Sequence, residues 1–140
     1  RNWPPAQPEG AGAMAVAQYL STNPAVRTVH YPGLTRHPQH ALALGQLQGG
    51  FGSMVTFELM RNERAVAATV LNQLQLFTQA VSLGDVDSLA CHPASTTHSV
   101  VSAEVRARNG VTEGLIRLSV GIEHPDDLIA DLERALRFAA

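Results

Sequence analysis

The chain has 140 residues and a formal charge of −2, and its 45% hydrophobic and 16% charged residues are typical of one globular domain. Twelve acidic residues against ten basic ones leave no surplus to displace counterions, which argues against nucleic-acid binding. Without an apolar run of membrane-spanning length or a signal peptide, and with Cys91 as its single cysteine, the chain is expected to be cytoplasmic and free of internal disulfides.

Apolar spacing and turn residues predict helices and strands in alternation after an extended, proline-rich lead-in over Arg1–Pro8. The predicted helices are Gly10–Leu20, Pro38–Gln48, Asn62–Leu76, Ser102–Arg108 and a last one that begins near Pro125. The predicted strands are Val26–Tyr31, Ser53–Leu59, Phe77–Leu83 and Leu115–Gly121. Asp85–Ser99 shows no period and is predicted to be a loop. This order indicates an α/β or α+β domain.

The last helix carries the strongest start signals, because Pro125 lies in its first turn and two aspartates follow at the positive end of the helix dipole. Its predicted buried face consists of Leu128, Ile129, Leu132, Ala135 and Leu136.

Arg117 is the most suggestive single residue. On the strand Leu115–Gly121 it shares one face with Leu115 and Ser119, while the neighbouring residues form the other face. One interpretation is that Arg117 is simply exposed to solvent on the solvent-facing side of an antiparallel strand. The other is a guanidinium held on a rigid strand to grip a carboxylate through two parallel hydrogen bonds.

Other candidate site residues carry weaker signals. Ser82 lies at the end of an apolar run, just before Gly84. It is interpreted either as a serine in a turn or as a residue that offers its hydroxyl at the edge of a cleft. Two groups of histidine and cysteine residues could be considered as metal ligands. Neither group has a recognised zinc-binding spacing, so no metal site is predicted. The two groups are Cys91, His92 and His98, and His30, His37 and His40. Asp85 and Asp87 are interpreted as turn acids, and Cys91 as a quiet buried thiol.

All ten basic residues are arginines, so the chain has no lysine at all. Chemistry that needs a lysine Schiff base, a lysine general base or a P-loop lysine therefore cannot be completed by this chain alone.

Four motifs in order resemble the carboxy-terminal domain of the pyridoxal-phosphate enzymes of cysteine and methionine metabolism, the trans-sulfuration family of cystathionine γ-synthase. The first of these motifs is Tyr31–Leu34 with His37–His40, and the others are Phe77–Leu89 with His92–Ser99, Glu113–Glu123, and Asp126–Leu132. The resemblance is clear from Val26 to Leu136. It implies an α+β fold, the small carboxy-terminal domain of fold type I enzymes, in which helices pack on an antiparallel sheet of about four strands.

The resemblance also implies roles for four residues. Arg117 matches the arginine that binds the substrate α-carboxylate, and Ser82 matches a serine beside the substrate. Thr97, in a motif usually written Met-Thr-His, matches a residue of the same wall, although Thr96 stands here in place of the methionine. Val81 matches a specificity position that is often glutamate in enzymes acting on cystathionine.

Valine at position 81 favours substrates without a distal ammonium group, since it offers that group no carboxylate partner. The chain therefore looks most like methionine γ-lyase, which converts L-methionine to methanethiol, 2-oxobutanoate and ammonia. The O-acetyl- and O-succinylhomoserine sulfhydrylases follow closely, and cystathionine γ-synthase and γ-lyase remain alternatives. A non-catalytic, stand-alone binding or scaffolding domain is the alternative from another class.

The family implies pyridoxal 5′-phosphate as cofactor, and it places the cofactor-binding domain and its Schiff-base lysine ahead of this domain. Residues 1–140 are therefore expected to be one small domain without catalytic or cofactor-binding residues of its own, inactive until a pyridoxal-phosphate-binding domain or chain completes it. The expected partners are that amino-terminal portion, a small sulfur amino acid and further copies in a homotetramer, with neither nucleic acid nor membrane.

Overall fold

The computed structural model describes residues 10–140, so the predicted lead-in Arg1–Pro8 lies outside the described residues. Its α-helices are α1 (Ala11–Thr22), α2 (His40–Gln46), α3 (Arg64–Gln73), α4 (Ala103–Arg108) and α5 (Pro125–Leu136). Its strands are β1 (Val26–His30), β2 (Met54–Leu59), β3 (Thr78–Gln79), β4 (Leu89–Cys91) and β5 (Leu115–Ser119). Two short 3₁₀ turns complete the set, η1 (Pro93–Ser95) and η2 (Arg137–Ala139).

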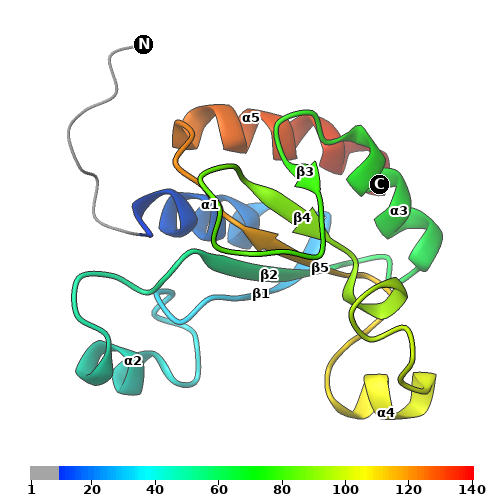
Figure 1. The fold of residues 1–140 in the computed structure, drawn as a ribbon, viewed down its shortest axis with the longest axis horizontal. Helices are drawn as coiled ribbons and strands as arrows, with labels where there is room; N and C mark the ends of the chain where they lie inside the picture. The colour runs from blue at the N-terminus through cyan, green and yellow to red at the C-terminus, as the bar shows by residue number, and fades with distance from the viewer. Residues whose placement is uncertain (1–9) are drawn as a thin grey trace.

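The strands form one sheet in the order β1-β2-β5-β4-β3, antiparallel except for the parallel pair β3 and β4. Helices α1, α3 and α5 lie together on one side of this sheet, while α2 and α4 project at opposite ends of the molecule (Figure 1). The hydrophobic core fills the space between the sheet and these three helices. Its largest fully buried side chains are Tyr31, Phe57, Leu20, Leu59, Ile116, Leu118, Leu128 and Leu132.

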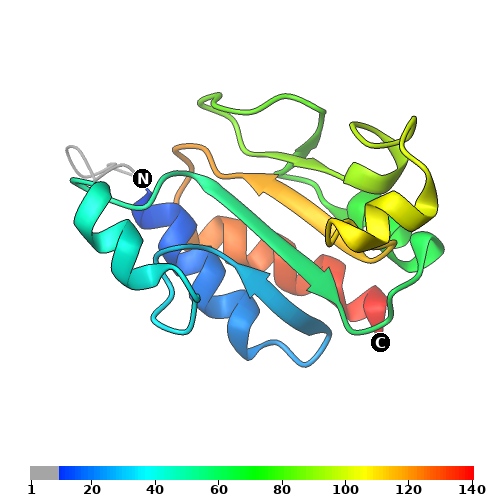
Figure 2. The ribbon, with the colours of Figure 1, turned by 90° about the horizontal axis from the view of Figure 1, so that it is seen from below.

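Within residues 10–140, no α-helix covers the opposite side of β5. It is crossed instead by the segment 80–88, which lies on the other side of β5 from α1 and α5 (Figure 2). The alternation predicted for β5 explains this arrangement, because Ile116 and Leu118 point into the core and Arg117 and Ser119 point toward segment 80–88.

The α+β class and the mainly antiparallel sheet predicted from the sequence are confirmed, with five strands rather than about four. The extra strand is β4, which lies inside the stretch Asp85–Ser99 that was predicted to be a loop. All three of its residues are buried, so the run has neither the alternation nor the length that marks a strand in sequence. The predicted strand Phe77–Leu83 was wrong in its extent, since β3 covers only Thr78 and Gln79, and Ala80 adds one backbone hydrogen bond to Ala90.

The helices agree with the sequence to within a few residues at their ends. Ser102 caps α4 by accepting the Val105 N–H, and Gly110 ends it with a positive φ of 75°, as the residue types predicted. α2 begins at His40 rather than Pro38, and α3 covers Arg64–Gln73 rather than Asn62–Leu76. In residues 10–140, no helix has both the length and the apolar character that crossing a membrane requires.

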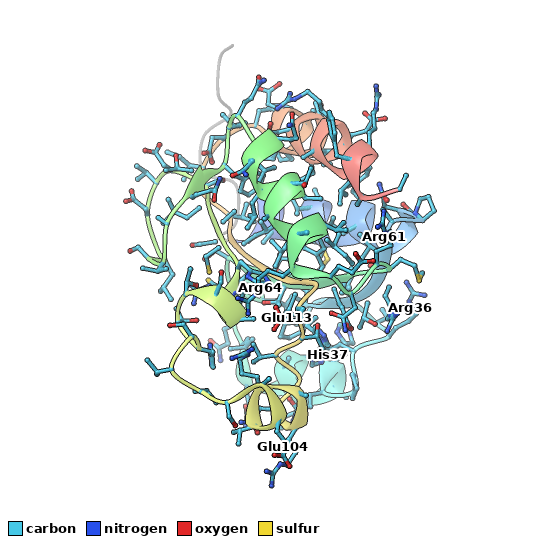
Figure 3. The ribbon with its side chains drawn as sticks, turned by 90° about the vertical axis from the view of Figure 1, so that its right-hand side faces the viewer. Arg36, His37, Arg61, Arg64, Glu104 and Glu113 are labelled. Atoms are coloured by element: carbon cyan, nitrogen blue, oxygen red, sulfur yellow. The ribbon has the colours of Figure 1, made fainter. Side chains whose placement is uncertain are left out.

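A cluster of two arginines and one glutamate joins α3 and α4 to the start of β5. Glu113 accepts hydrogen bonds from Arg64 Nε at 2.7 Å and from Arg106 Nη2 at 3.0 Å. Figure 3 shows Arg64 and Glu113 side by side. Arg106 is itself buried and also donates to the Val101 carbonyl. The hydrogen bond from Arg64 lowers the pKa of Glu113 from its usual 4.5 to about 2, with Arg106 adding to the effect and burial opposing it.

Replacing Glu113 with glutamine is expected to flatten the acid dependence of stability. A carboxyl group whose pKa is lowered on folding stabilises the native state above its unfolded pKa of 4.5, and that contribution disappears as the pH falls toward 2. Because the side chain is about one-third exposed, we expect a contribution of about 1 kcal/mol at pH 7. Urea unfolding at intervals from pH 7 to pH 2 measures it.

Glu104→Gln, which removes an exposed carboxylate from the neighbouring α4, controls for the loss of one negative charge. A Glu113→Gln curve that runs parallel to wild type between pH 5 and pH 2 would show that the cluster contributes nothing to acid stability.

Candidate functional site

The predicted site residues Arg117 and Ser82 are brought together on the face of the sheet that lies opposite the helices. Arg117 is half-buried in the middle of β5, and its Nη2 donates a hydrogen bond of 3.2 Å to the Ser82 carbonyl oxygen. The two residues are 35 positions apart in sequence. Contact between them therefore depends on segment 80–88 folding back over β5 (Figure 2).

Cys91 is the second neighbour of Arg117, because the two residues are directly opposite each other in the antiparallel pair of β4 and β5. The thiol is buried and makes side-chain hydrogen bonds with Arg117 and Thr96. Burial raises the pKa of the Cys91 thiol, while the positive charge of Arg117 and these hydrogen bonds act in the opposite direction. Arg117 is thus confined between the Ser82 carbonyl and a thiol on the neighbouring strand.

Thr97 lies in the exposed turn that follows η1, where its hydroxyl pairs with His98 Nδ1 at 2.8 Å. Its neighbour Thr96 donates to the His92 carbonyl at 2.7 Å and also bonds to Cys91. The hydroxyl that reaches the neighbours of Arg117 is therefore that of Thr96. Thr96 occupies the position at which the family motif usually has methionine.

Val81 is 59% exposed, and it lies immediately before Ser82, two residues beyond the end of β3. It lines a cavity of about 560 Å³ together with Ala80 and Cys91. Leu83 is equally exposed on the other side of Ser82. An apolar surface thus flanks the carbonyl that Arg117 contacts.

The histidines considered as metal ligands are spread over separate parts of the fold. His92 is buried and bonds through its two ring nitrogens to Ser95 Oγ and the Glu113 carbonyl, both at 2.8 Å. His40 bonds to the Pro32 carbonyl and stacks on Phe51. Within residues 10–140, no group of three or more histidine, cysteine, aspartate or glutamate side chains is placed to hold a metal ion.

Three residues that the sequence analysis did not propose also belong to this site. Ser119 accepts the Gly84 N–H at 3.0 Å, and Glu123 accepts both the backbone N–H and the hydroxyl of Ser88 at 2.7 Å. Gly121 donates its N–H to Ser88 Oγ at 2.8 Å. The signal that could have identified them is the strand alternation, because Ser119, Gly121 and Glu123 follow Arg117 at every second position.

Comparison with known proteins identifies the class of protein to which this α+β domain belongs. The profile of the Cys/Met metabolism PLP-dependent enzymes matches residues 6–137. The L-methionine γ-lyase of Pseudomonas putida is 48% identical over 130 residues, which are 93% of this chain and 32% of that protein. The O-succinylhomoserine sulfhydrylase of Mycobacterium tuberculosis is 45% identical, again over 93% of this chain and 32% of its own length.

A solved structure agrees with the sequence comparison. The cystathionine γ-lyase of Micromonospora echinospora superposes with a TM-score of 0.84 at 48% identity, over 91% of this chain and 32% of that one. The chain belongs to the family of Cys/Met metabolism PLP-dependent enzymes. It spans about a third of the length of the relatives it matches.

Proposed function

We propose that this chain is the substrate-binding, carboxy-terminal portion of a pyridoxal-phosphate-dependent methionine γ-lyase. Its overall reaction converts L-methionine and water to methanethiol, 2-oxobutanoate and ammonia. In this proposal residues 1–140 form one small domain, and a pyridoxal-phosphate-binding portion outside these residues completes the enzyme as a homotetramer. The observation that carries the proposal is the contact between the Arg117 guanidinium and the Ser82 carbonyl.

Arg117 has the geometry that carboxylate binding needs. A guanidinium has five N–H donors arranged as a fork, so the bond to Ser82 fixes its plane and leaves donors for a carboxylate. Two parallel hydrogen bonds to a carboxylate define its orientation as well as its position. The Ser82 hydroxyl completes the proposed substrate wall, and the family resemblance adds Thr97, whose hydroxyl pairs with His98 in this structure.

The cofactor does not fit this chain by itself. Covalent attachment of pyridoxal phosphate needs a lysine amine, and no lysine occurs in the 140 residues. Pyridoxal phosphate supplies the electron sink for this class of reaction. The part we assign to this chain is orientation, because holding the α-carboxylate in place fixes the direction of the reacting bonds at the substrate Cα.

Val81 supports methionine as the substrate. A methyl thioether loses nothing beside an exposed valine, whereas the distal ammonium of cystathionine would lack a carboxylate there, at a cost of about 1–3 kcal/mol. The same argument admits the O-acylhomoserine substrates of sulfhydrylases, and the 45% identity with a sulfhydrylase keeps that activity as the second candidate.

Reconstitution tests the proposal against a non-catalytic scaffolding role. After unbound pyridoxal phosphate is removed, the chain alone is expected to retain no visible absorbance of the cofactor. The chain co-purified with the amino-terminal portion of a methionine γ-lyase is expected to show the visible absorbance of the cofactor joined to a protein amine. Methanethiol release from L-methionine should then exceed turnover of cystathionine or of O-acylhomoserines with sulfide. An assembled, coloured enzyme that prefers either of the latter would contradict methionine as the substrate, and failure to assemble would favour scaffolding.

A further inference from the structure

Alternate residues of β5 and of the segment after it all bind the segment 82–88, which we call the Ser82 loop. Arg117 donates to the Ser82 carbonyl, and Ser119 Oγ accepts the Gly84 N–H. Gly121 N–H donates to Ser88 Oγ, and Glu123 accepts both the N–H and the hydroxyl of Ser88. The period of two places Arg117 and Ser119 on the same face of β5, and the contacts of Gly121 and Glu123 continue this alternation beyond the end of the strand.

The approach of the loop to the strand is closest at Gly121. A Cβ atom at this position would lie 2.2 Å from the Val86 carbonyl oxygen and 2.8 Å from the Asp87 carbonyl carbon, both of which are backbone atoms. The Val86 carbonyl oxygen also accepts the Ile122 N–H at 2.9 Å. Only glycine at position 121 therefore allows the loop to reach its hydrogen-bonding partners.

Polar bonds rather than apolar packing hold the Ser82 loop in place. Its large apolar side chains, Leu83 and Val86, are each 59% exposed, as is Val81 immediately before the loop, so they gain little from burial in this fold. The anchoring hydroxyls have the opposite environment, because Ser119 is 2% and Ser88 is 0% exposed. A hydrogen bond to a buried partner is costly to leave unmade, which makes these anchors decisive for the position of the loop.

We propose that Ser119 and Glu123 are positioning residues that hold Ser82 against Arg117 for substrate binding. This inference rests on the proposed function, in which Arg117 and Ser82 contact the substrate carboxylate. Neither Ser119 nor Glu123 touches the substrate in this arrangement. Ser119 fixes the loop two residues after Ser82, and Glu123 fixes its far end through Ser88.

Amide hydrogen exchange on the 140-residue chain tests the anchors directly. Ser119→Ala removes the acceptor of the Gly84 N–H, and Glu123→Ala removes both oxygens that accept from Ser88. We expect exchange about tenfold faster at Gly84 in the first variant and at Ser88 in the second. Ser102→Ala is the matched control, because its hydroxyl also accepts a backbone N–H, on α4 away from this loop.

Steady-state kinetics of the assembled enzyme then separate positioning from general stability. We expect Ser119→Ala and Glu123→Ala each to raise KM for L-methionine about fivefold with kcat within twofold, while Ser102→Ala changes neither. Exchange or KM unchanged in both variants overturns the inference, provided that Arg117→Ala raises KM. An unchanged KM in Arg117→Ala instead overturns the proposed function, and the exchange results at Gly84 and Ser88 still report whether the anchors exist.

Discussion

Arg117→Ala in the assembled enzyme is expected to raise KM for L-methionine about 100-fold. The substitution removes both hydrogen bonds to the substrate carboxylate, and loss of one partner of a desolvated charge pair costs on the order of 2–5 kcal/mol. A 100-fold change corresponds to about 2.7 kcal/mol, within that range. Initial-rate measurements of methanethiol release over a wide range of L-methionine concentrations provide KM and kcat separately.

Two variants control this experiment. Arg117→Lys keeps the positive charge but loses the planar fork, so it is expected to fall between alanine and the wild type. Arg108→Ala removes an exposed arginine at the end of α4 and is expected to leave KM within twofold. If Arg117→Ala bound L-methionine as tightly as the wild type does, Arg117 would not be the carboxylate ligand.

Asp131→Ala is expected to lower the free energy of unfolding by about 3 kcal/mol, the largest stability effect of a single side chain considered for this fold. Asp131 is 3% exposed on α5, and its carboxylate accepts the backbone N–H groups of residues 75–77 at 2.9–3.2 Å. Arg134 donates to the same carboxylate. Alanine would leave these three N–H groups without their acceptor at the turn between α3 and β3.

Urea denaturation and thermal unfolding of the 140-residue chain measure this effect. A loss of about 3 kcal/mol is expected to lower Tm by about 10 °C in a domain of this size. Glu133→Ala, two residues along α5, removes an exposed carboxylate that pairs with Arg137 at 3.7 Å and is expected to change stability by less than about 0.5 kcal/mol. Equal stabilities for the two variants would show that water replaces the Asp131 acceptor at no cost.

Asp131 also shows why the sequence predicted the apolar face of α5 but not its polar member. Leu128, Leu132, Ala135 and Leu136 are buried as predicted, and Ile129 packs partly against the core. Asp131 lies on the same face, yet its partners are backbone groups from a turn more than fifty residues earlier. Helical periodicity identifies a face, and it carries no information about distant N–H groups that a polar residue on that face will bind.

The strands give a similar contrast. β2 and β5 were predicted closely because their apolar residues alternate, which is a local signal. β4 is three residues long and buried on both faces, and it pairs with β5 on one side and β3 on the other. Its existence depends on those neighbours, so it could not be predicted from its own residues.

The sequence by itself determined the family, the α+β class, the absence of any lysine and Arg117 as the carboxylate-binding candidate, because motifs, composition and strand periodicity are properties of the chain alone. Only the tertiary structure decided that Arg117 meets the Ser82 carbonyl, that Cys91 lies opposite it, and that Ser119 and Glu123 anchor the loop between them. These contacts join residues about 26 to 35 positions apart, and their geometry is set by strand register and by the loop closing over Gly121.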